Sequence, residues 1–239
     1  MLDWLDAYTV KARLFPAILA AAPALAFALV QVGGKLSDFG LPEVIITITV
    51  AVLFFYLADF SRRSGLRVER RMFAGSGGRP FPTVLRHRDE TLDTRSKLRY
   101  HTFLATKLGT AAPTALSEAS APKDADGFYI ECGNWLRENT RDHERFNVLF
   151  NENITYGARR NLLGLKPAGL LLNALVVIIS IIQFHSGGWE DVSRHGAILL
   201  IAAIHALVFL FLVTEDSVRN ASDQYGRQLA LSCETLMNS

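Results

Sequence analysis

Hydrophobic residues along this chain gather in four long runs separated by polar sequence. The runs cover residues 14–32, 43–60, 165–184 and 196–214. Each is close to the ~20 residues that a helix needs to cross the hydrocarbon core of a bilayer, and none carries a charge in its interior. None shows the alternation of polar and apolar residues that a membrane β-strand requires. The pattern therefore predicts four transmembrane helices.

Helical signals also dominate the polar sequence between the second and third runs. One helix is predicted to start at an N-cap, Asp93, and to stop at Gly109. The next stretch, residues 110–127, is rich in Ala, Ser and Pro and is expected to be a loop. A short helix should follow, and then a long helix over residues 142–166 that continues into the third span as far as Pro167.

The predicted fold class is thus an all-α membrane protein with two pairs of spans and a helical cytosolic domain inserted between spans two and three. Five regions are expected: an interfacial segment at 1–13, two spans within 14–60, a basic cytosolic domain at 61–164, two spans within 165–214, and a cytosolic C-terminal helix at 215–239.

Lysine and arginine residues are unevenly distributed. Of the 25, 19 lie between Ser61 and Lys166, together with 12 of the 23 acidic residues. Five arginines directly follow the second run, whereas the loops at 33–42 and 185–195 hold one basic residue each. Basic residues near spans stay on the cytoplasmic side. Both termini and the central segment are therefore expected in the cytoplasm of a bacterial-type inner membrane.

Basic residues with interleaved aromatic residues crowd the start of the central segment. The basic residues are Arg86, Arg88, Arg95, Lys97, Arg99 and Lys107, and Tyr100, His101 and Phe103 lie among them. Guanidinium groups beside aromatic rings suit phosphates and stacked bases. This composition favours a nucleotide or oligonucleotide ligand. The alternative is attraction to anionic lipid together with the positive-inside signal.

One face of the predicted long helix mixes polar and apolar residues. At 100° per residue, that face carries Phe146, Leu149, Phe150, Asn153, Gly157 and Arg160. An unpaired amide or guanidinium is costly to bury, so Asn153 and Arg160 each need a partner. An internal hydrogen-bond network or an ion pair between subunits would supply one. In the alternative, Arg160 and Arg159 bind an anionic ligand or a phospholipid headgroup just above the bilayer.

Polar side chains also recur inside the apolar runs. Asn173 and Ser180 lie seven residues apart, hence on one helix face, and Gln183 lies one turn further. His205 lies in the fourth run. Lipid offers no hydrogen-bond partners, so these side chains should face other helices or water. They either join helices or line a pore or gate, and a pore would require a symmetric oligomer.

Catalytic patterns are poorly represented. Cys132 and Cys233 fit no zinc or redox spacing, which favours a reducing compartment. The histidines of the central segment lie in no metal-ligand spacing, and there is no nucleophile elbow or dinucleotide fingerprint. We therefore expect no enzyme, no metal and no cofactor.

Two stretches carry a resemblance to a known group of proteins. They are FPTVLRHRDETLDTRSKLRYH (Phe81 to His101) and YGARRNLLGLKP (Tyr156 to Pro167), and they are similar to a family of small bacterial four-span proteins. The layout resembles anti-phage membrane effectors of the Hailong type. That resemblance implies an oligomeric channel, a single-stranded DNA ligand made by an operon-encoded nucleotidyltransferase, and growth arrest when the gate changes.

Together these features favour a ligand-gated, homo-oligomeric ion channel, with a tetramer favoured. Its ligand would be a nucleotide or single-stranded oligonucleotide held by Arg86, Arg88, Arg95, Lys97, Arg99, Tyr100, Arg159 and Arg160. Its pore or gate would comprise Asn153, Asn173, Ser180, Gln183 and His205. The alternative is a non-conducting membrane anchor or scaffold with a basic face for lipid or protein partners. A transporter is disfavoured because the two halves show no inverted sequence symmetry.

Overall fold

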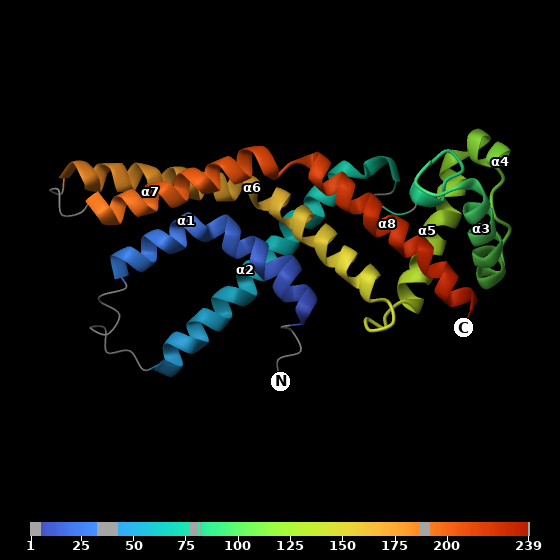
Figure 1. The fold of residues 1–239 in the computed structure, drawn as a ribbon, viewed down its shortest axis with the longest axis horizontal. Helices are drawn as coiled ribbons and strands as arrows, with labels where there is room; N and C mark the ends of the chain where they lie inside the picture. The colour runs from blue at the N-terminus through green and yellow to red at the C-terminus, as the bar shows by residue number, and fades with distance from the viewer. Residues whose placement is uncertain (1–5, 33–42, 77–80, 82, 187–191, 239) are drawn as a thin grey trace. The chain divides into compact units, whose positions relative to one another are not determined.

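The computed structural model describes residues 6–32, 43–76, 81, 83–186 and 192–238. Within these residues the chain is helical and has no strand, so the all-α prediction is confirmed for them (Figure 1). The α-helices are α1 (Phe15–Val32), α2 (Glu43–Met72), α3 (Thr94–Leu108), α4 (Ala115–Ser120), α5 (Pro122–Asn139), α6 (Asn147–Ser186), α7 (Val192–Leu207) and α8 (Glu215–Met237). Short π-helical segments, Thr9–Leu14 and Val208–Leu212, precede α1 and follow α7.

The chain divides into two compact units. The span unit comprises residues 1–68 and 157–217, and the charged unit comprises residues 69–156 and 218–239. Most of the C-terminal helix α8, from Val218 on, therefore shares a unit with residues 69–156 of the central segment. The charged unit holds 15 basic and 14 acidic residues, which is nearly balanced. The excess of arginine in the central segment thus comes largely from residues that flank the apolar runs and belong to the span unit.

Three helical segments in the described part of the chain are long and apolar enough to cross a membrane. They are Thr9–Gln31, Asn147–His185 and His195–Leu212. The second predicted span, residues 43–60, forms the start of α2, and several of its side chains lie outside the described residues. The structure is therefore compatible with a multi-pass membrane protein, and the fourth span stays a prediction.

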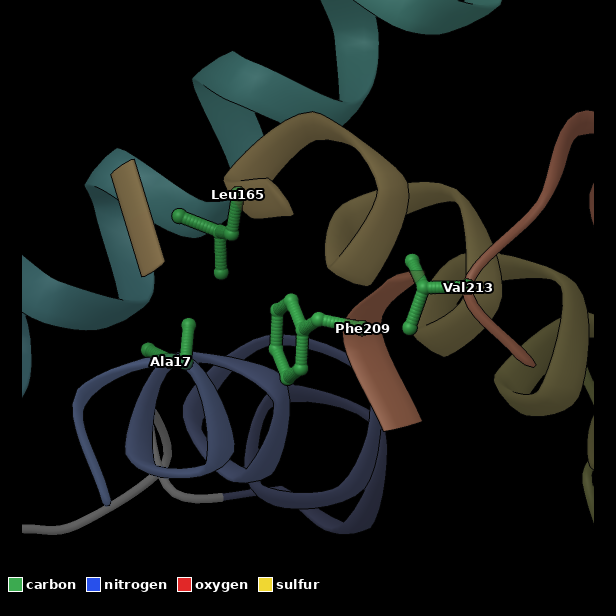
Figure 2. Close-up of a cluster of buried hydrophobic side chains, with 5 residues drawn as sticks. Ala17, Leu165, Phe209 and Val213 are labelled. Carbon is green, nitrogen blue, oxygen red and sulfur yellow. The ribbon is translucent and has the colours of Figure 1, made fainter. Parts of the chain in front are cut away.

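The core of the span unit brings α1 and α6 together with the segment that follows α7. Ala17 of α1, Leu165 of α6 and Phe209 are each almost fully buried, and the Phe209 ring lies between the other two helices (Figure 2). Many other large apolar side chains of this unit are exposed, including Leu171 at 63% and Phe211 at 70%. An exterior so apolar suits lipid rather than water.

Glycines allow α2 and α6 to approach closely. A Cβ atom placed on Gly164 would lie 2.4 Å from the backbone carbon of Ser64. One placed on Gly65 would lie 1.8 Å from Oδ1 of Asn161, whose amide nitrogen donates to the carbonyl of Ala12 at 2.6 Å. Small residues of this kind permit backbone contact between membrane helices.

Local signals set the ends of α3 as predicted. Asp93 is the N-cap, and its carboxylate accepts a hydrogen bond from the backbone N–H of Ser96 at 2.9 Å. Gly109 ends the helix with a φ of 65°, in the left-handed region that glycine adopts without strain.

The prediction of a loop over residues 110–127 is wrong, because this stretch contains α4 and the start of α5. Thr114 and Ser117 form a capping box that starts α4. Pro122 then occupies the first turn of α5, where its missing N–H costs nothing. The short helix predicted over 128–139 is therefore the second part of an 18-residue helix.

Helix α6 is 40 residues long and passes through Pro167 without ending there, contrary to the predicted stop. Proline removes one backbone hydrogen bond, to the carbonyl of Leu163, but its neighbours in a packed bundle can compensate for that loss. The described start of α6 is Asn147 rather than residue 142, and α6 passes from the charged unit to the span unit after Tyr156.

Candidate functional site

A row of polar side chains lies inside the span unit, between α6 and α7. It comprises Asn173 with His205, Gln183 with His195, and Ser180. At one end of the row, the amide nitrogen of Asn173 donates to the carbonyl of Ala202 at 2.9 Å and lies 3.2 Å from Nδ1 of His205. The His205 ring stacks on Phe209, with centroids 4.2 Å apart. The predicted partners Asn173 and His205 are therefore in contact, although they come from different runs.

At the other end of the row, Gln183 joins three helices. Its Oε1 lies 3.1 Å from Nε2 of His195 in α7 and accepts a hydrogen bond from the side chain of Gln31 in α1 at 2.8 Å. Ser180 lies one turn before Gln183 on the same face of α6. The sequence analysis missed Gln31 and His195, because each stands at the edge of an apolar run, where polar residues are common.

Burial separates the row from the lipid-facing side of the same helices. Asn173, Ser180 and His205 are 4%, 0% and 7% exposed, whereas Ile178 is 54% exposed. The prediction that the polar side chains face other helices is thereby met in a single chain. Among the described residues, two buried atoms of the row lack a hydrogen-bond partner, Oδ1 of Asn173 and Oγ of Ser180, whereas the His205 ring has the backbone carbonyls of Leu19 and Ala20 beside it. Unpartnered polar atoms are costly away from water, so the row is poorly suited to a purely structural role.

The basic residues at the start of this membrane segment are held by backbone carbonyls and amides. Lys166 donates from Nζ to the carbonyl of Val213 at 2.9 Å, and Arg159 donates to the carbonyl of Ser217 at 3.2 Å. Arg160 is buried, and its Nε lies 3.4 Å from Oδ1 of Asn161. The Arg160 guanidinium therefore has an internal partner, which agrees with the interpretation that it belongs to an internal hydrogen-bond network. Asn153 is half-buried in the charged unit and does not belong to the row.

In the charged unit, several predicted ligand-binding residues take part in an internal network. Arg86 forms two hydrogen bonds, each 2.7 Å, with the carboxylate of Asp126. Lys97 is buried, and its ammonium donates to the backbone carbonyls of Arg86, at 2.8 Å, and Asp89. These contacts anchor the segment before α3, and they engage Nε and Nη2 of Arg86 and the ammonium of Lys97 in the fold.

A buried carboxylate, Glu118, completes this network. It accepts hydrogen bonds from the backbone N–H of His87 at 2.8 Å and from the hydroxyl of Tyr129 at 2.7 Å. Burial alone would raise the pKa of Glu118, but these hydrogen bonds hold the pKa below its ordinary value. Arg88 lies at the edge of the network, 3.9 Å from Glu118, and stays mostly exposed. Sequence reasoning missed Glu118 because it lay in the stretch predicted as a loop.

His101 stacks within the same core. Its Nε2 lies 2.7 Å from the carbonyl of Leu85, and its ring stacks on Tyr129 at 5.5 Å between centroids. Burial lowers the pKa of His101, so the neutral ring donates its proton from Nε2 to that carbonyl.

The outer face of α3 remains available for a ligand. Arg99 forms an exposed ion pair with Glu234 of α8, and Tyr100 donates to the same carboxylate at 2.6 Å. Burial and this hydrogen bond raise the pKa of Tyr100 to about 12. Arg95 is exposed and forms no ion pair with any described residue. An open hollow of about 540 Å³ is lined by Arg95, Leu98, Arg99, Thr102, Phe103, Thr106 and Met237.

Comparisons with known proteins identify no relative. No protein-family model, curated protein or solved structure matches the chain. The chain's own geometry therefore carries the functional inference. Of the thirteen predicted site residues, it brings Asn173, Ser180, Gln183 and His205 into one row, and it leaves Arg95 and Arg99 on one accessible face.

Proposed function

We propose that this protein is a ligand-gated, homo-oligomeric ion channel of the bacterial inner membrane. The observation that carries the proposal is the buried polar row from Gln183 to Asn173, which includes two atoms without a partner among the described residues, Oδ1 of Asn173 and Oγ of Ser180. Polar groups at membrane depth are expensive, and they either join helices or line a path for ions or protons.

The row would serve as the gate rather than as an open pore. In one chain it is closed, because Ser180 is fully buried and apolar neighbours such as Val176 and Ile198 are nearly so. Conduction would require the helices to part in a symmetric assembly, for which a tetramer is our preferred state. The outward apolar side chains of α2, such as Val52 and Phe55, would then contact lipid or a neighbouring subunit.

The accessible face of α3 would bind the ligand. Its two guanidinium groups, on Arg95 and Arg99, border a hollow with the aromatic ring of Phe103, a combination that suits phosphates and stacked bases of a single-stranded oligonucleotide. The ligand would compete with Glu234 for Arg99. Since α6 is one continuous helix that contributes to both units, it would carry the change towards the row.

We further propose, from the resemblance of residues 81–101 and 156–167 to anti-phage membrane effectors, that this activity serves anti-phage defence. A nucleotidyltransferase encoded in the same operon would supply the oligonucleotide, and a change of the gate would dissipate the membrane potential. The ligand's effect on the gate, opening or closing, would follow directly from the flux measurement below.

The decisive experiment measures ion flux from liposomes that contain the purified protein, with and without a single-stranded oligonucleotide. Asn173→Leu should abolish the ligand-dependent change in flux, because it replaces the amide by an apolar group of similar size. Ile178→Leu, on the exposed side of α6, is the matched control and should behave as the wild type. If the oligonucleotide leaves the ion flux through the wild-type protein unchanged, the proposal is contradicted.

Ligand binding is tested separately on the detergent-solubilised protein. Arg95→Glu combined with Arg99→Glu should abolish salt-sensitive oligonucleotide binding. Arg141→Glu, which reverses one exposed arginine outside this hollow, paired with Glu138, is the control for charge reversal elsewhere in the unit and should bind normally. Equal loss of binding in both variants would indicate general charge attraction instead of a site on α3.

A non-conducting anchor or scaffold is the second candidate, and one observation favours it. Arg86, Lys97 and Tyr100 have internal partners, so part of the predicted basic face stabilises the fold. If that is the main role, cells that express the protein with its activating partner keep their membrane potential, whereas a channel depolarises them.

A further inference from the structure

Two arginines from separate helical segments line a small hollow at the basic end of the first two spans. The hollow has a volume of about 190 Å³ and is lined by Thr9, Arg13, Phe55, Ala58, Asp59 and Arg62. Arg13 directly precedes the first apolar run, and Arg62 lies two residues after the second. Both guanidinium groups therefore belong to the same end of a pair of antiparallel spans.

The arrangement of the charges leaves the hollow cationic. Asp59 supplies its carboxylate, but that carboxylate is already paired with Arg63 at 2.7 Å. Arg13 lies 5.2 Å from the centroid of the Tyr8 ring, and its Nη1 is 3.5 Å from the hydroxyl of Thr9. Arg62 is exposed, and it forms no ion pair within the described part of the chain. Two guanidinium groups thus remain to bind an anion, with the Thr9 hydroxyl beside them.

The lining changes from polar to apolar along α2. Phe55 lies two turns before Arg62 on α2, towards the middle of the span, and is 54% exposed. A ligand that fills the hollow would therefore place an anionic group between Arg13 and Arg62 and an apolar part against Phe55. Arginine suits phosphate through its planar set of donors, and phospholipid is the amphiphile that is present at this depth.

We propose that this hollow binds the phosphate headgroup of an anionic phospholipid, with the first part of an acyl chain against Phe55. The site is independent of the gating row and of the α3 face, and it would fix the depth of α1 and α2 in the inner leaflet. Lipid bound there would be a stoichiometric ligand rather than part of a diffuse attraction to a basic surface.

The test uses the full-length protein in detergent, titrated with dioleoylphosphatidylglycerol or dioleoylphosphatidylcholine, with bound lipid counted by native mass spectrometry. Arg13→Gln and Arg62→Gln should each weaken binding of phosphatidylglycerol about fivefold. Arg67→Gln removes the same charge from the same stretch of α2, outside the hollow, and should leave the affinity unchanged. Asp59→Asn should strengthen binding, since it removes the carboxylate that faces the phosphate.

Three outcomes would overturn the proposal. Equal effects of Arg62→Gln and Arg67→Gln would mean that the attraction is diffuse. An unchanged or weaker affinity in Asp59→Asn would mean that the phosphate lies elsewhere, and this variant decides the matter even if an arginine variant fails to fold. Glycerol 3-phosphate binding as tightly as the lipid would assign the site to a soluble phosphate ester. None of these results depends on whether the protein conducts ions.

Discussion

The substitution Gly164→Ala tests how closely α2 and α6 pack where they cross in the span unit. The new Cβ would lie 2.4 Å from the carbonyl carbon of Ser64, 2.6 Å from its oxygen and 2.7 Å from the backbone nitrogen of Gly65. Contacts between carbon atoms are favourable at about 3.5–4.0 Å, so α2 would have to withdraw by about 1 Å. The obstructing atoms belong to a helix backbone and cannot turn aside as a side chain could.

The expected loss of stability follows from two opposing terms. Overpacking of this kind costs about 1–3 kcal/mol, and replacing glycine by alanine inside a helix recovers up to about 1 kcal/mol. A net loss of about 1–2 kcal/mol is therefore expected. For a chain of this size, each kcal/mol lowers the unfolding midpoint by about 2–4 °C, which gives a total decrease of about 2–8 °C.

Thermal unfolding of the detergent-solubilised protein, followed by intrinsic fluorescence at one fixed scan rate, measures this decrease. Gly196→Ala is the matched control in the same unit, because no described atom outside its own stretch of helix lies within 4 Å of the position its Cβ would take. The control should be as stable as the wild type or slightly more so. If Gly164→Ala unfolds at the same temperature as Gly196→Ala, the close contact between α2 and α6 is refuted.

Three further predictions concern the charged unit, each read from thermal unfolding of the full chain. Hydrogen bonds from the backbone N–H of His87 and from Tyr129 hold the pKa of Glu118 below its ordinary value of 4.5. The stability that its ionised carboxylate contributes is therefore complete above that pH and is lost as pH falls through the lower pKa of the folded state. Glu118→Gln should lose less stability between pH 5 and 3 than the wild type, and an equal loss would exclude this carboxylate as the cause. Burial lowers the pKa of His101 from 6.5, so the unfolded chain binds more protons below that pH than the folded chain does. The wild type should therefore lose stability as pH falls from 7.5 to 5.5. His101→Gln, which can still donate to Leu85, should lose less, and a steeper loss would contradict a lowered pKa of His101. Gly109→Ala should cost about 1 kcal/mol, because alanine is strained at a φ of 65°, and an unchanged midpoint would contradict that backbone conformation.

Local sequence signals predicted those parts of the structure that depend on near neighbours. The ends of α3 follow from Asp93 and Gly109, which act on residues within one turn. The burial of Asn173 and Ser180 follows from the absence of hydrogen-bond partners in lipid, and it needed no knowledge of which helix lay opposite. Both predictions rest on rules that hold for any helix in such a setting.

Sequence patterns could not predict contacts between residues that lie far apart along the chain. Arg86 was predicted to face a ligand, yet its guanidinium meets Asp126, 40 residues further along the chain. Pro122 was read as a mark of a loop, although a proline in the first helical turn is compatible with either state. A charged side chain near the surface can bind a ligand or a neighbouring carboxylate, and only the packing of α5 against the segment before α3 decides between them.

Polar atoms of the row that lack a partner would affect the free-energy difference between a closed and an open gate. Admission of water between α6 and α7 would satisfy Oδ1 of Asn173 and Oγ of Ser180, and each such atom gains about 1–3 kcal/mol when it is satisfied. Parting the helices would in turn expose apolar neighbours such as Val176 and Ile198, at about 25 cal/mol per Å² of surface. These two terms are opposite in sign and offset each other in the free-energy difference between a dry and a hydrated row. Ligand coupling energies are typically about 1–3 kcal/mol, and energies of that size shift such an offset balance more readily than they shift a fully satisfied or fully apolar interface. A row that is buried and incompletely hydrogen-bonded is therefore the arrangement that a ligand-controlled gate requires.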